Sequence, residues 1–187
     1  MKGKKLNVKR LMGILFLLVS LIMAGIRLTM DPYDYSGAAA FDIHGSHDNR
    51  AVCVEIEALE ESFAHDDELL YCLGYGGSAA YVIALPAETL EALRQKEHFI
   101  SSDQLLMIFD QPQMLTGCSQ SLSSRLRKLI MDEYHLDEAQ LGQNLGESFL
   151  AVGQPVNRDK AAVLTAGAAI LLTAGIVCLL KKGKRTR

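Results

Sequence analysis

Residues 161–180 read AAVLTAGAAILLTAGIVCLL, an unbroken run of twenty residues without a charged side chain. An α-helix rises about 1.5 Å per residue, so a helix of this length spans the roughly 30 Å hydrocarbon core of a bilayer. The alternative is a buried core helix, but the run is long for one and leads directly into the basic sequence KKGKRTR at 181–187. The stretch therefore predicts a transmembrane helix.

A second apolar block lies near the start of the chain. Residues 11–26 read LMGILFLLVSLIMAGI and carry no charge, and the segment continues through Arg27 to Met30. Arg27 falls near one end, where a long side chain reaches the lipid headgroups. A cleavable signal peptide begins in the same way, but this run is long for one and no A-x-A-like cleavage site follows it. We predict an uncleaved transmembrane helix over residues 11–30.

The charges outside these blocks are unevenly distributed. The tails at 1–10 and 181–187 contain Lys and Arg but no Asp or Glu, whereas residues 31–158 carry 21 Asp and Glu against 7 Lys and Arg, a net charge of −14. Lys and Arg in short loops stay on the cytoplasmic side of a membrane. We therefore predict a multi-pass cell-membrane protein with both termini in the cytoplasm and the central domain outside it. The inverted topology is the alternative.

The composition of the central segment excludes some function classes. Nucleic acid is an unsuitable partner for so acidic a domain, because phosphate binding needs clustered Lys and Arg. The sequence contains no phosphate-binding loop, dinucleotide fingerprint or H-E-x-x-H motif. Gly76-Gly77-Ser78 lacks the second glycine of a nucleophile elbow and is typical of a hairpin turn. We predict a protein that is not an enzyme and uses no cofactor.

The first part of the central segment changes from irregular to strand-like. Residues 31–50 are rich in Asp, Gly, Ser and Pro and show no periodicity, which is typical of a juxtamembrane linker. From residue 51 the sequence AVCVEIEA alternates apolar and polar residues, which predicts a half-buried strand. Residues 69–85 then predict a β-hairpin whose turn lies at the glycine pair, and the polar residues His65, Asp66, Asp67 and Glu68 form the connection before it.

The later part of the central segment alternates between helix and strand patterns. Helices are predicted at 86–96 and 119–134, strands at 105–110 and near Met114, and a short helix before a last strand at 148–152. Residues 51–155 are thus predicted to be an α+β domain with a mainly antiparallel sheet. The order of its elements fits a small, partly open barrel of the OB type.

The whole layout resembles a known type of protein. Its order is basic tail, span, insert, span and basic tail, and its strands include AVCVEIEA and LLYCLGY. In these respects the chain resembles uncharacterised two-span membrane proteins of Gram-positive bacteria with an extracytoplasmic α+β insert. The resemblance implies a plasma-membrane location and supplies no functional residues, because the type carries no known activity.

Three cysteines lie in the central domain, and Cys178 lies in the second apolar block. Cys53 and Cys72 fall on consecutive predicted strands, where opposed residues approach within disulfide distance if the register brings them together. This odd count allows one disulfide and leaves one thiol, Cys118. The alternative is that Cys53 and Cys72 are separate small residues of the core or surface.

The sequence FDIHGSHD at 41–48 is the one local cluster of metal-capable side chains. His and carboxylate side chains suit zinc and similar ions. A solvated loop is the alternative interpretation, because the cluster contains Gly and Ser and has no identifiable distant partner. The candidate ligands are Asp42, His44, His47 and Asp48.

Small residues recur along the second apolar block and predict close helix packing. One stripe holds residues four apart, and two glycines eight apart lie beside it; the packing candidates are Thr165, Gly167, Ala169, Thr173 and Gly175. The first block, with Gly13, Ser20, Ala24 and Gly25, is one candidate neighbour, and another membrane protein is the alternative. Besides the lipid bilayer, other membrane proteins are therefore predicted partners.

These observations lead to two functional hypotheses. The first is an accessory subunit of a membrane assembly whose acidic extracytoplasmic domain binds a protein or a ligand. The alternative is a metal-dependent extracytoplasmic enzyme or metal sensor that uses Asp42, His44 and His47.

Overall fold

The computed structural model describes residues 8–45, 49–66, 68–101, 106–156 and 158–180. The chain forms two compact units. The helical unit contains α1 (Val8–Thr29) and α5 (Arg158–Leu180), and the barrel unit spans Tyr33–Val156. Two long apolar helices thus occupy the two predicted spans, and each is long and apolar enough to cross a membrane.

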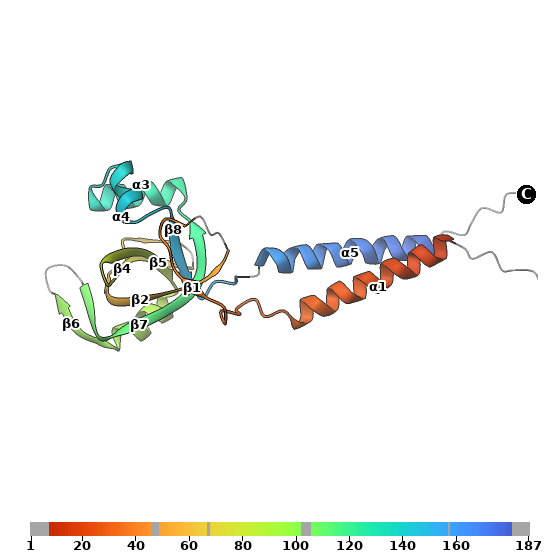
Figure 1. Ribbon diagram of the computed structural model, residues 1–187, viewed down its shortest axis with the longest axis horizontal. Coiled ribbons are helices and arrows are strands. Elements are labelled where there is room, and N and C mark those ends of the chain that lie inside the picture. The colour runs from red at the N-terminus through yellow and green to blue at the C-terminus, as the bar shows by residue number, and fades with distance from the viewer. Residues whose placement is uncertain (1–7, 46–48, 67, 102–105, 157, 181–187) are drawn as a thin grey trace, which may run out of the picture. The chain divides into compact units, whose positions relative to one another are not determined.

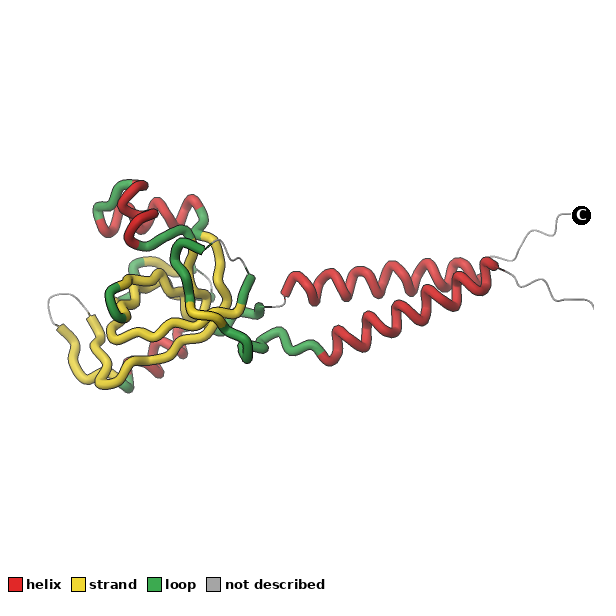
Figure 2. Tube along the Cα trace, viewed as in Figure 1, coloured by secondary structure: helices red, strands yellow, loops and turns green. Residues whose placement is uncertain are grey.

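The helices α1 and α5 pack through small residues. A Cβ atom on Gly175 would lie 3.0 Å from the carbonyl oxygen of Gly13. About two turns further along the pair, the hydroxyl of the buried residue Ser20 donates a hydrogen bond to the carbonyl oxygen of Ala168 over 2.9 Å. The contacts run in opposite directions along the two helices, so the pair is antiparallel, as Figure 2 also shows.

The barrel unit is built around a closed ring of strands (Figure 1). The order around the ring is β2, β4, β5, β8 and β7, and pairing of β7 with β2 closes it. Only the β5–β8 pairing in the ring is parallel. The strands are β1 (Ala39–Ala40), β2 (Ala51–Glu60), β3 (Ala64–His65), β4 (Leu70–Gly76), β5 (Ala79–Leu85), β6 (Glu97–Ser101), β7 (Leu106–Ser121) and β8 (Ser148–Val152). The α+β class is confirmed, and the partly open barrel that we predict is instead a closed one.

Two hydrophobic clusters stabilise the barrel unit. The first fills the ring, and the predicted alternation of β2 is confirmed, because Val52, Val54 and Ile56 are buried within it. Helix α2 (Ala87–Arg94) adds Leu90 and Leu93 to the same cluster. The second cluster lies on the outer face of β4, β5 and β8, where α3 (Ser124–Tyr134) and α4 (Glu138–Asn144) cover it.

Strand β7 is longer than the two short strands that the sequence predicts. Its pairing with β2 shifts between Ile56, opposite Gln113, and Ala58, opposite Ile108. Pro112 lies inside this irregularity, where no ladder hydrogen bond from its nitrogen is needed. The strand therefore continues past Pro112, although a proline in the sequence predicts the end of a strand.

The helix predicted at 119–134 begins later in the structure. Residues up to Ser121 belong to β7 and pair with β8. Ser123 is the N-cap of α3, and its hydroxyl accepts a hydrogen bond from the backbone N–H of Leu126 over 3.2 Å. Both the strand pairing and the cap place the start of the helix at Ser124.

Most of the segment predicted as a linker at 31–50 belongs to the barrel unit, which begins at Tyr33. Strand β1 pairs in parallel with β2, and Phe41 is buried in the barrel interior. The hydroxyl of Tyr35 also donates to the carbonyl oxygen of Gln154 over 2.6 Å. A two-residue strand is too short to show a periodicity, so no sequence pattern reveals it.

Candidate functional site

A groove of about 450 Å³ lies on the barrel unit between β3, β4 and the start of α3. Its volume is within the range of about 300–1,000 Å³ typical of small-molecule sites. Apolar groups of Ala64, Leu126 and Leu129 line part of it. The polar side chains in the lining are His65, Asp66, Tyr71, Ser123 and Arg125.

Asp66 is held as an anion at this groove. One of its carboxylate oxygens accepts backbone N–H groups from Glu68 at 3.0 Å and Leu69 at 2.7 Å, and the other accepts the hydroxyl of Tyr71 at 2.8 Å. The hydrogen bond from Glu68 is the main cause that lowers the pKa of Asp66. Burial, with the bond to Asp66, raises the pKa of Tyr71 to about 12. Tyr71 is therefore a neutral donor and Asp66 a fixed negative charge at neutral pH.

Arg125 is a cation without a carboxylate partner among the residues that the structure describes. Two other arginines of the barrel unit are each paired twice: Arg94 with Glu61 at 3.4 Å and Glu91 at 2.9 Å, and Arg127 with Glu138 and Glu147. The first turn of α3 contains no acidic residue. Arg125 thus places an unpaired positive charge in an otherwise acidic unit.

A second polar cluster attaches α3 to the barrel. The carboxylate of Glu60 accepts hydrogen bonds from the hydroxyl of Tyr75 and, at 2.8 Å, from that of Tyr134 at the end of α3. The ring of Tyr134 also packs edge to face on Phe63, with centroids 5.7 Å apart. Burial, followed by the hydrogen bond to Glu60, raises the pKa of both tyrosines. The cluster therefore favours neutral tyrosines that donate to a carboxylate.

The raised tyrosine pKa values predict a loss of stability at high pH. Unfolded tyrosine loses its proton near pH 10, whereas Tyr75 and Tyr134 keep theirs in the folded state. Their contribution is thus complete below about pH 10 and declines as the pH rises above it. In urea unfolding of the detergent-solubilised protein, we expect Tyr134→Phe to lose less stability than wild type between about pH 9 and pH 11. Equal losses in the two proteins would contradict this assignment.

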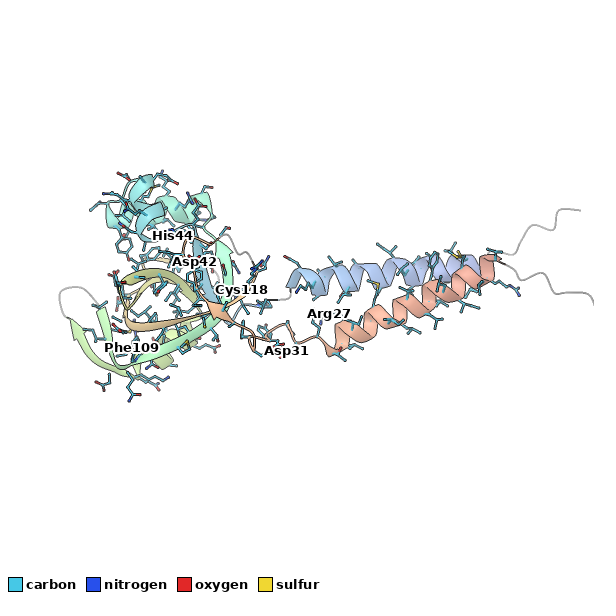
Figure 3. All side chains as sticks on the ribbon, in the orientation of Figure 1. Arg27, Asp31, Asp42, His44, Phe109 and Cys118 are labelled. Atoms are coloured by element: carbon cyan, nitrogen blue, oxygen red, sulfur yellow. The ribbon has the colours of Figure 1, made fainter. Side chains whose placement is uncertain are left out.

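The candidate metal ligands are only partly described. The carboxylate of Asp42 accepts the backbone N–H of His44 at 3.0 Å, so it closes a local turn (Figure 3). His47 and Asp48 lie outside the described residues. Among the described residues, no group of three His, Cys, Asp or Glu side chains is close enough to hold a metal ion.

The structure does not bring Cys53 and Cys72 together. Their strands β2 and β4 do pair, but through Ala58 opposite Tyr75 and Leu59 opposite Gly74. Cys53 instead lies opposite Thr116 of β7, and Cys72 lies opposite Ile83 of β5. Both are free thiols. Burial raises the pKa of Cys72 to about 12, which makes it an unreactive core residue. Cys118 is also buried, and its thiol donates a hydrogen bond to the carbonyl oxygen of Ser119 over 3.6 Å.

The small residues of the second span separate into two groups. Gly167 and Gly175 face α1, where their Cβ atoms would meet Met23 and Leu17. Thr165 and Thr173 bond their own helix, through the carbonyl oxygens of Ala161 and Ala169. Ala169 and Thr173 are exposed and line a shallow apolar depression with Ile170, Ala174 and Val177.

No sequence pattern points to the groove or to the Glu60 cluster. His65 and Asp66 belong to the predicted hairpin connection, and an acidic turn before a strand offers no signal for a site. Arg125 lies far from them in sequence and reaches the groove only because α3 packs across β4. No family model matches the chain, and neither a curated protein nor a solved structure matches it.

Proposed function

We propose that this chain is a two-span membrane protein whose barrel unit lies outside the cytoplasm and binds a protein or a ligand as an accessory subunit of a larger assembly. The proposal is carried by one observation. Along the sequence, two apolar helices precede and follow a folded acidic unit, and the charged residues of their outer flanks are all basic. Large apolar side chains such as Leu21, Val163 and Ile170 are more than 60% exposed in the helical unit. Lipid would remove this surface from water.

The proposed binding role is supported by the topology of the barrel. In chain order the five ring strands are β2, β4, β5, β7 and β8. The first three form antiparallel neighbours, α2 follows them, and β7 and β8 close the ring, which fits the OB type of five-stranded barrel. OB barrels bind ligands with the loops that connect their first and second strands and their fourth and fifth strands. In this chain those connections carry β3 and α3, which are the two walls of the groove.

We propose binding rather than catalysis as the role of this unit. Asp66, Tyr71 and Arg125 supply an anion held by three donors, a neutral tyrosine and a guanidinium group, which suit recognition by charge. The groove also contains His65 and Ser123, and the hydroxyl of Ser123 serves as the N-cap of α3, where it accepts the backbone N–H of Leu126. The resemblance to two-span proteins of Gram-positive bacteria and the location in the plasma membrane stay predictions.

Cysteine labelling in intact cells tests the topology. In a variant without the native cysteines, Gln111→Cys, at an exposed position of β7, should react with a membrane-impermeant maleimide before lysis. The matched variant Lys182→Cys, in the second basic tail, should react only after permeabilisation. The reverse pattern would place the acidic unit in the cytoplasm and overturn the proposal.

Recovery of a partner tests the accessory role. Mild-detergent purification of the full chain from cells after cross-linking should recover a second membrane protein in a defined ratio. Recovery of the monomer alone, under conditions that preserve other assemblies, would contradict this part of the proposal.

A further inference from the structure

The groove between β3 and α3 contains one fixed charge of each sign. Asp66 is negative because three donors stabilise its carboxylate, and Arg125 supplies a guanidinium cation. Among the described residues, Arg125 has no carboxylate partner, whereas Arg94 and Arg127 are each paired twice. The groove therefore offers the carboxylate of Asp66 as an acceptor and the guanidinium group of Arg125 as a donor, and these two described residues do not form an ion pair with each other.

The charges restrict the ligand that matches this groove. A purely anionic molecule would meet Asp66 and an acidic unit, and a purely cationic one would meet Arg125. A zwitterion satisfies both, with its anionic group on Arg125 and its cationic group on Asp66. Leu129, whose side chain is 40% exposed at the groove, would contact an apolar part of the same molecule.

We propose that the groove binds a small zwitterion with an apolar side chain, of the class of free amino acids and dipeptides. The ligand carboxylate lies on Arg125, the ammonium group lies on Asp66, and the apolar side chain covers Leu129 and the wall formed by Ala64. The volume of about 450 Å³ suits a molecule of this size. The inference rests on the proposed binding role of the barrel unit and names its ligand class.

Calorimetric titration of the full-length protein in detergent tests this inference with leucyl-leucine as the probe. We expect binding of the free dipeptide and a loss of about tenfold or more when its amine is acetylated or its carboxylate amidated. Arg125→Gln should weaken binding of the free dipeptide by a similar factor and should remove most of the effect of amidation. Lys128→Gln is the matched control, because Lys128 is exposed on α3 but does not line the groove.

Several outcomes would overturn the inference. They are equal binding of free and capped dipeptides, equal affinities of the Arg125→Gln and Lys128→Gln proteins, and no binding tighter than about 10 mM. Tighter binding of glycerophosphoethanolamine, a zwitterionic lipid headgroup, would replace the amino-acid class by a lipid class. Recovery of a membrane partner by both the wild-type and the Arg125→Gln proteins, with no dipeptide binding, would uphold the proposed function and reject this ligand.

Discussion

Replacement of Gly146 by alanine should lower the free energy of unfolding of the barrel unit by about 2–5 kcal/mol. Gly146 follows α4 with a φ of +73°, a conformation that costs any other residue energy. An added Cβ would lie 1.9 Å from the carbonyl oxygen of Ile43. That oxygen accepts the backbone N–H of Glu147 at 3.1 Å, so relief of the clash would also break this hydrogen bond.

Gly142 provides the matched control for this prediction. It lies within α4, and nothing is within 4 Å of the Cβ that alanine would add. Gly142→Ala should therefore leave stability unchanged or raise it by up to about 1 kcal/mol, through helix propensity alone. Urea unfolding in detergent, followed by near-ultraviolet circular dichroism of the tyrosines, measures both variants. Equal stabilities of the two alanine variants would contradict the requirement for glycine at position 146.

The sequence was sufficient for those parts of the fold that have a local pattern. The two apolar helices follow from uncharged length alone, and β2 follows from its alternation of buried and exposed residues. Helix α4 begins at a capping box formed by Asp137 and Gln140, which is also a local feature. In each case, residues that are close together in the sequence are sufficient to explain why the helix or strand forms.

The remaining parts depend on contacts between distant residues. Phe41 is buried because β1 pairs with β2. Strand β7 continues beyond Pro112 because its pairing with β2 shifts register at that point. The groove requires α3 to lie across β4, which brings Arg125 near Asp66 only in the folded unit. No periodicity in a single sequence encodes these relations, so the candidate site could not be predicted.

The attachment of α3 gives the second large expected effect. Glu60→Ala should lower the free energy of unfolding by about 1–3 kcal/mol, because the hydroxyls of Tyr75 and Tyr134 would lose a charged acceptor. The cluster is only partly buried, so water replaces some of what is lost. Glu57→Ala is the matched control, since Glu57 is exposed on the same strand. It should change stability by less than about 0.5 kcal/mol.

A double-mutant cycle separates the hydrogen bond from the packing of the ring. Tyr134→Phe keeps the edge-to-face contact with Phe63 and removes only the hydroxyl. If Glu60 acts through that hydroxyl, Glu60→Ala should cost less in the Tyr134→Phe background, with a coupling of about 0.5 kcal/mol or more. Additive effects would mean that Tyr134 holds α3 by its ring alone. Arg125 lies on the same helix, α3. Loss of the contacts that attach α3 to the barrel should therefore also lower the affinity of the groove for its ligand.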